Sequence, residues 1–234
     1  MRRRQPSFDF LEFLATDGHL NEENGHNGNG HAPDRLPSLQ ELSEQHGVSI
    51  SVLREQLRVA RALGLVEVKP RTGIRRLPYS FAPAVQESLL YAITRDRSRF
   101  DQFSDLRRHI EKIYWAEAVG QLTDQDLKRL RTLLDRADQK LHGDPIRLPH
   151  AEHRDLHLTI FSHLENPFVT GLLEAYWEAY DEVGLSRYER LSYLEKVWDF
   201  HRQIVEALEQ GDFDAGYRAL SEHFDLIDQR PANE

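Results

Sequence analysis

Cysteine is absent from this chain of 234 residues, and methionine occurs once. The absence of thiols excludes disulfide bonds and thiolate ligands, so any bound metal has to be held by imidazole nitrogen and by oxygen. No apolar run approaches the roughly 20 residues of a membrane span, and the basic N-terminus MRRRQPS lacks the apolar core of a signal peptide. We therefore expect a cytoplasmic protein that does not contact a membrane.

Positive charge is also scarce, because 30 Lys and Arg face 39 Asp and Glu, which gives a net charge of −9. Residues 36–78 differ, with seven Lys and Arg against four Asp and Glu, a balance of +3, so the rest carries −12. Phosphate repels an acidic surface, so only this basic segment could bind nucleic acid. The length suits a small domain at 1–78 and a larger one at 79–234.

The basic segment has the start and stop signals of two short helices. Ser38 and Glu41 have the spacing of a capping box, which predicts a helix that begins at Ser38. Gly47 permits the left-handed backbone of a tight turn, and Ser49 can cap a second helix. The segment therefore predicts a helix-turn-helix.

A β-hairpin should follow the second helix. Val66 and Val68 alternate with charged residues, Pro70 to Gly73 reads as a turn, and Ile74 opens a return strand. This layout predicts a winged helix-turn-helix that binds a double-stranded DNA operator, and the alternative is a winged helix used for protein contacts. The candidate DNA-contacting residues are Ser49, Ser51, Arg54, Arg58, Lys69, Arg71, Thr72, Gly73 and Arg75.

An apolar segment, Phe8 to Leu14, precedes the winged helix and predicts an extra helix that packs behind it. Residues 18–34 have many Gly and Asn and no apolar periodicity, which is typical of a flexible insertion. The histidines of this insertion could be mistaken for a metal-binding tract, but nothing there would preorganise them.

The remainder, from Pro83 onward, predicts helices and almost no strand. The fold class is thus mainly α, with a winged helix and an all-α second domain. The expected helices span 84–97, 101–120, 123–141, 149–164, 167–184, 190–210 and 212–229.

Four histidines of this second domain occupy positions where the helical pattern calls for apolar side chains. His153 and His157 are four residues apart in one helix, and His201 and His223 lie on the apolar stripes of two others. One divalent cation could satisfy all four imidazoles. Hydrogen bonds from each histidine to a carbonyl or a carboxylate are the alternative.

Arg107 lies beside an apolar stripe that contains Phe103, Ile110 and Tyr114. A guanidinium in that position is expected to bind a carboxylate with two hydrogen bonds. The carboxylate could belong to a bound effector, or to an acidic side chain in a buried salt bridge.

The first domain resembles the DNA-binding domain of the GntR family of bacterial transcription regulators, through LPS, VSISVLREQL and PRTGI. Many members carry a basic residue where this chain has Gln40, and an arginine where it has Ile50. Arginine binds guanine through two hydrogen bonds, so the operator is expected to differ from the family's common sequence or to bind more weakly.

The second domain resembles the FCD effector domain of the FadR-type branch of that family, through HRDLHLTIFSHLENP, WDFHRQIVEALEQGD and ALSEHF. The resemblance places His157, His201 and His223 at metal-ligand positions. It also gives Arg107 the role of binding an effector carboxylate. Metal-binding members usually have an aspartate where this chain has His153, and a set of four imidazoles favours Zn, Ni or Cu over Mn or Mg.

These observations predict a homodimeric, ligand-responsive transcription regulator that is not an enzyme. It would sense a small organic acid through Arg107 and a divalent metal, most readily Zn or Ni. Two alternatives remain. One is a helical-bundle metalloenzyme, and the other is a binding module that has lost DNA recognition.

Overall fold

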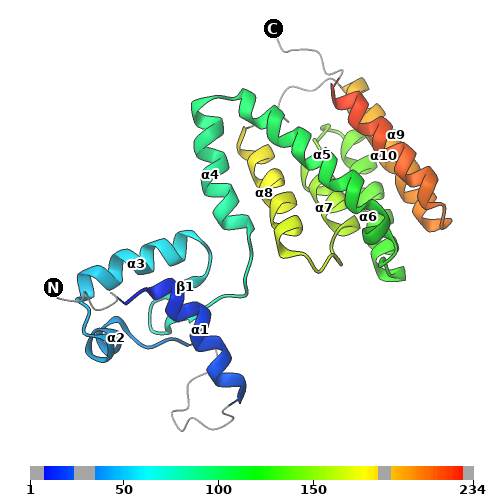
Figure 1. Cartoon of the computed structure of the whole chain (residues 1–234). Helices are drawn as coiled ribbons and strands as arrows, with labels where there is room; N and C mark the ends of the chain where they lie inside the picture. Colours follow the sequence, from blue (N-terminus) through cyan, green and yellow to red (C-terminus); the bar gives the residue numbers. More distant parts are fainter. Residues whose placement is uncertain (1–7, 24–34, 184–190, 229–234) are drawn as a thin grey trace. The chain divides into compact units, whose positions relative to one another are not determined.

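The computed structural model describes residues 8–23, 35–183 and 191–228 (Figure 1). Contacts within the chain divide it after Ala84 into two compact units. The boundary expected after Pro78 lies in the connection between the second strand and the fourth helix. Within the described ranges, no helix is both long and apolar enough to cross a membrane.

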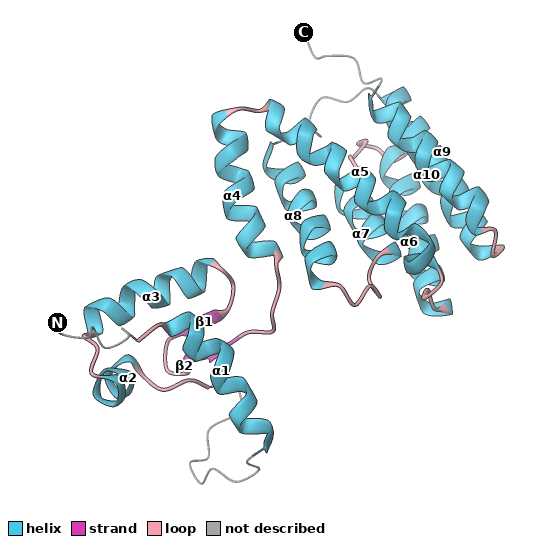
Figure 2. Ribbon diagram, in the orientation of Figure 1, coloured by secondary structure: helices cyan, strands magenta, loops and turns pink. Residues whose placement is uncertain are grey.

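The first unit is a winged helix-turn-helix, as predicted (Figure 2). Its strands form one antiparallel hairpin, in which Val66 is opposite Arg76 and Lys69 is opposite Gly73. Buried Leu42, Leu53 and Ile74 hold the helices against this hairpin. The elements are α1 (Phe10–Glu23), α2 (Leu39–His46), α3 (Ile50–Ala62), β1 (Val66–Lys69) and β2 (Gly73–Arg76).

The predicted helix signals are confirmed. The Ser38 hydroxyl accepts from the Glu41 amide, and the Glu41 carboxylate accepts from the Ser38 amide at 2.7 Å. Gly47 has a φ of 66°, the left-handed conformation that glycine adopts without a steric penalty. The Ser49 hydroxyl accepts from the Val52 amide and caps α3.

Helix α1 corrects the prediction for the N-terminal segment. It extends to Glu23, so residues 18–23 of the expected flexible insertion are helical, and 24–34 lie outside the described residues. Asp9 caps its start by accepting from the Leu11 amide, and Phe10 is fully buried. Once a helix is nucleated and anchored in this way, each further residue adds a backbone hydrogen bond at little cost.

The second unit is an all-α bundle, as predicted. Helix α6 packs against α7 and α9, and α9 packs against α10. Helix α7 ends at Ile160, four residues before the predicted end, because a turn follows at Phe161. The helices are α4 (Ala82–Arg95), α5 (Ser98–Val119), α6 (Asp124–Leu141), α7 (His150–Ile160), α8 (Pro167–Val183), α9 (Leu191–Glu209) and α10 (Phe213–Asp228).

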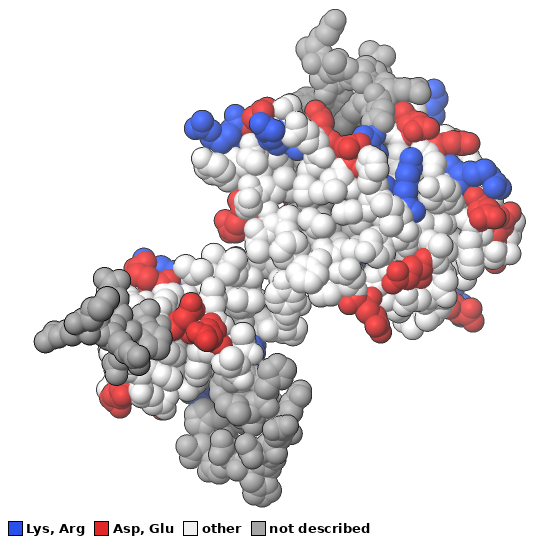
Figure 3. Space-filling view, in the orientation of Figure 1, with Lys and Arg blue, Asp and Glu red and all other residues white. Residues whose placement is uncertain are grey.

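The bundle core is mainly apolar. Side chains such as Leu130, Leu156 and Leu220 are fully buried. Five ionisable side chains are nearly as inaccessible, with exposed fractions of 3% or less: Arg107, Glu111, His157, His201 and His223. On the outer face shown in Figure 3, carboxylates lie among Lys and Arg side chains. Burial of an ionisable group is costly unless a partner compensates it, so the five buried groups need an explanation of their own.

Candidate metal and effector site and candidate DNA interface

The four histidines predicted as ligands come together inside the bundle. Helix α7 supplies His153 and His157, α9 supplies His201, and α10 supplies His223. One nitrogen of each ring lies within 4.8 Å of the corresponding nitrogens of the other three. The Nε2 atoms of His157 and His201 are 3.2 Å apart. The helix stripes read from the sequence thus converge on one point.

Several of these imidazole nitrogens are buried without a hydrogen-bond partner among the described residues. They are Nε2 of His153, Nδ1 of His201 and both nitrogens of His223. Burial is the main cause that lowers the pKa of these three histidines well below the ordinary value, and the charge of Arg107 lowers it further. Neutral imidazoles with free lone pairs are the form that binds a metal ion.

Glu111 on α5 contacts the outer nitrogen of His157. Its Oε2 lies 3.0 Å from Nδ1 of His157, whose Nε2 faces the other histidines. Burial opposes ionisation of this carboxyl group, but Arg107 and His157 outweigh burial and lower the pKa of Glu111 to about 2. A buried carboxylate that orients an imidazole in this way is typical of the second layer of a metal site.

Arg107 lies beside the histidine cluster and forms a salt bridge with Glu111. Its Nε donates to Oε1 of Glu111 at 2.6 Å, and its Nη2 donates to Oε2 at 3.3 Å. The guanidinium stacks 4.6 Å from the ring centre of Tyr176 and 4.7 Å from that of Trp177. The buried salt bridge, one of the two possibilities left open by the sequence, is therefore present.

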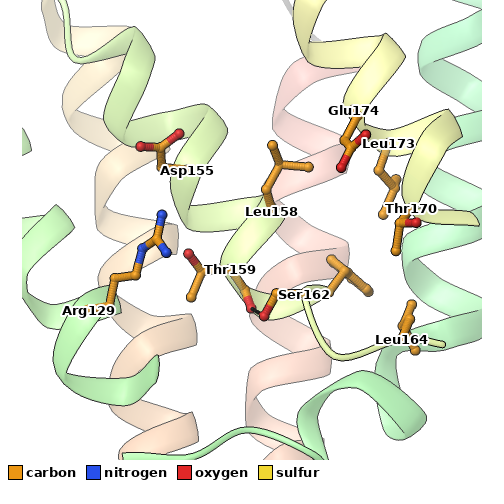
Figure 4. A pocket seen from close by; sticks show the side chains of 10 residues that line it. Arg129, Asp155, Leu158, Thr159, Ser162, Leu164, Thr170, Leu173 and Glu174 are labelled. Carbon is orange, nitrogen blue, oxygen red and sulfur yellow. Dashed lines mark hydrogen bonds between the residues drawn. The ribbon is translucent and has the colours of Figure 1, made fainter. Parts of the chain in front are cut away.

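A separate hollow of about 390 Å³ lies between α6, α7 and α8 (Figure 4). Helix α7 lines it with Asp155 and Thr159, which face away from His153 and His157 at 3.6 residues per turn. Arg129 and Glu174 line it from the two other helices. This hollow is therefore not an entrance to the histidine cluster.

Helix α3 presents the first group of predicted DNA-contacting residues. Ser51, Arg54 and Arg58 are exposed, whereas the hydroxyl of Ser49 is engaged in the cap. Arg58 forms an exposed ion pair with Glu55 at 3.1 Å. Arg54 forms no ion pair with any described residue, which leaves its charge available to a phosphate or a base.

The wing presents the remaining predicted residues. Lys69, Arg71 and Thr72 are exposed, and Gly73 and Arg75 are half-buried. Lys69 pairs with Glu67 at 2.8 Å. Arg71 has a φ of 70°, a left-handed conformation that a residue with a side chain adopts at a cost of about 1 kcal/mol or more. The hairpin turn thus holds a cation outward at its tip.

Sequence reasoning did not assign Glu111, Tyr176 and Trp177 to the site. The spacing of Arg107 and Glu111, four residues apart in a helix, is the signal that could have identified Glu111. Trp177 lies 4.7 Å from the His153 ring, centre to centre, and no short motif around it indicates this contact. Its place depends on how α8 packs against α7.

A winged helix joined to an all-α bundle with a buried polar centre defines a class of DNA-binding regulators. Comparison with known families agrees, because the FCD domain matches residues 102–226 and the family described as bacterial regulatory proteins, gntR family, matches residues 26–75. The chain therefore belongs to the GntR family, in the group that carries an FCD domain. It is a transcription regulator and not an enzyme.

Relatives are similar over most of this chain. The HTH-type transcriptional regulator YieP of Escherichia coli (strain K12) is 29% identical over 189 residues, which cover 79% of this chain and 80% of the relative. LutR of Bacillus subtilis (strain 168) is 24% identical over 215 residues, 86% and 93% of the two chains. The solved structure of Streptococcus agalactiae GntR has the same fold, with a TM-score of 0.64 at 20% identity over 92% of this chain and 97% of that one.

Proposed function

We propose that this regulator is a homodimer whose helical unit senses a small organic acid through a divalent metal, Zn or Ni. The observation that carries the proposal is the convergence of His153, His157, His201 and His223, whose candidate ligand atoms all lie within 4.8 Å of one another. In the proposed dimer, each protomer places one recognition helix in one half-site of the operator.

The donor set fits such a metal. Four nitrogens at zinc–nitrogen bond lengths of about 2.0–2.1 Å in a tetrahedron would lie about 3.3 Å apart. The separation of 3.2 Å between Nε2 of His157 and Nε2 of His201 is close to that value. A set of imidazoles without a carboxylate favours Zn, Ni or Cu over Mn or Mg. Zinc can expand from four to five ligands, so a cation held by the four imidazoles would still be able to accept a carboxylate oxygen of the acid.

The charge balance supports an anionic effector. Neutral imidazoles do not compensate a divalent cation, and the charges of Arg107 and Glu111 cancel each other. A buried net charge is costly, so an acid that binds beside the histidines would reduce this cost. We assign Arg107 as the second anchor of the acid. Glu111 already accepts two hydrogen bonds from Arg107, so an incoming carboxylate has to share or replace that pairing.

Native mass spectrometry of chelator-treated protein, with Zn or Ni added back, tests the metal and the oligomer together. We expect a dimer with about one metal per chain, and we expect His201→Ala to lose the metal. His163→Ala is the matched control, because His163 pairs with Asp126 outside the cluster. A protein that stays free of metal after incubation with both ions would contradict the proposed site.

The role of Arg107 needs a variant that does not bury an unpaired charge. Replacing one partner of a buried ion pair costs about 3–5 kcal/mol, so the test is the double variant Arg107→Met with Glu111→Gln. We expect it to bind operator DNA normally but to lose the response to small carboxylates such as lactate, succinate and citrate. Arg108→Met is one control, because Arg108 pairs with the exposed Asp105. Glu111→Gln alone is the second, and all variants are compared at saturating metal, because Glu111 also contacts the candidate ligand His157. An unchanged response in the double variant would contradict the assignment.

A further inference from the structure

The first turn of α3 presents two aliphatic side chains to solvent. Ile50 is 37% exposed and Val52 is 47% exposed, although the adjacent Leu53 is fully buried in the core. Val59, two turns further along α3, is 50% exposed. Single exposed aliphatic side chains are ordinary on protein surfaces. Two of them at the N-terminal end of a recognition helix lie where side chains contact base edges, so they limit which bases the helix can bind.

The other groups at this end of α3 restrict what it can recognise. The Ser49 hydroxyl is occupied in the cap, and Ser51 is exposed. Arg54 is the nearest cation on the helix, and Arg58 is paired with Glu55. The end of α3 therefore combines one available guanidinium and one available hydroxyl with two groups that cannot form hydrogen bonds.

The chemistry of the major groove selects a partner for those two groups. Guanine presents two acceptors and cytosine presents an amino group, and an aliphatic side chain over either would leave polar atoms desolvated and unpaired. Thymine presents a C5-methyl group, which an aliphatic side chain contacts favourably. We propose that Ile50 and Val52 each contact a thymine methyl group, so that every half-site carries thymines beneath the first turn of α3. This inference rests on the proposed DNA interface.

Uracil tests the inference, because it differs from thymine only by the missing methyl group. A binding sequence is first selected from a random duplex library, and each thymine is then replaced singly by uracil. We expect two positions per half-site at which the loss of the methyl group weakens binding about fourfold, the effect of exposing one buried methyl-sized group. Ile50→Ser should abolish the sensitivity at one of these positions, and Val52→Ser should abolish it at the other.

Val59→Ser is the matched control, because it removes an equally exposed valine from the far part of the same helix. It should leave both sensitive positions unchanged. Tolerance of uracil at every position by the unmodified protein, or a selected sequence without thymine beneath α3, would overturn the inference while leaving the DNA interface intact. Failure to bind any duplex would overturn the interface as well, and would favour a protein partner for the two aliphatic side chains.

Discussion

Nδ1 of His157 lies 3.0 Å from Oε2 of Glu111, while Nε2 of the same ring lies 3.2 Å from Nε2 of His201. Arg107 also approaches Nδ1 of His157, with its Nη2 at 3.0 Å. With a proton on Nδ1, His157 donates to the carboxylate and directs the lone pair of Nε2 toward the other histidines. Glu111 thus favours the tautomer that a metal requires, and Arg107 keeps Glu111 ionised. The Nη2 of Arg107 can only donate, so its approach to Nδ1 favours the other tautomer and competes with Glu111.

We expect Glu111→Gln to weaken Zn binding by about 10- to 100-fold, because an amide orients the imidazole and supports its basicity less well than a carboxylate. Competition with a chromophoric chelator measures the affinity. Asp126→Asn is the matched control, since it also removes a carboxylate that contacts a histidine, here Nε2 of His163 at 2.8 Å. Equal affinity losses in the two variants would argue against a specific role for Glu111.

The stability of the metal-free protein should fall as the pH drops below about 6.5. Burial depresses the pKa of His153, His201 and His223 in the folded state, so the unfolded chain binds more protons in that range. Above the unfolded-state pKa, these histidines do not lower the free energy of unfolding. Below it, each of them lowers the free energy of unfolding by up to about 1.4 kcal/mol per pH unit.

Thermal unfolding in chelator between pH 7.5 and pH 5.5 measures this effect. The variant with His201→Gln and His223→Gln should show a shallower dependence of Tm on pH, since two of the depressed groups are removed. Identical slopes for the variant and the unmodified protein would mean that these imidazoles do not set the acid stability.

Arg54→Ala should weaken operator binding more than Arg58→Ala, because the exposed ion pair with Glu55 partly offsets the charge of Arg58. If Arg54 contacts a phosphate, its loss should also reduce the slope of log affinity against log salt concentration by about 0.9. Glu55→Gln should strengthen binding, since it releases Arg58 and removes a negative charge. Fluorescence anisotropy at several salt concentrations measures the operator affinity of each variant. A larger loss of affinity in Arg58→Ala than in Arg54→Ala would contradict the prediction.

Two glycines with similar backbone angles should differ in their tolerance of alanine. Gly47 and Gly64 have φ values of 66° and 70°, so either substitution costs about 1 kcal/mol of backbone strain. A Cβ at Gly47 meets no atom within 4 Å, whereas a Cβ at Gly64 would lie 2.5 Å from Cγ of Pro83. Urea unfolding should therefore show at least about 1 kcal/mol more destabilisation for Gly64→Ala. Equal losses would mean that Pro83 moves aside.

Most of the fold could be predicted from local sequence signals. The capping box at Ser38, the left-handed Gly47 and the cap at Ser49 each depend on a few neighbouring residues, so they can be read from sequence. The extension of α1 to Glu23 was not predicted, because composition favours a loop there, whereas Phe10 and Leu14 anchor the start of the helix in the core.

The histidine cluster was predictable for a different reason. Helical periodicity shows which side chains face inward, and His201 and His223 occupy apolar stripes. Periodicity does not show which inward residues meet across helices. The pairing of Glu111 on α5 with His157 on α7, and the stacking of Trp177 on Arg107, depend on the packing of three helices and could not be read from spacing.

The contacts within the histidine cluster join residues that are far apart in the sequence. Arg107 and His157 are separated by 50 residues, and His157 and His201 by 44. His223 enters only with the last described helix, α10. A nascent chain therefore lacks one of the four candidate ligands until α10 has left the ribosome and folded onto α9. A complete histidine cluster would mark a helical unit in which α10 has folded, and a chain truncated before α10 would lack the cluster however well its winged helix folds.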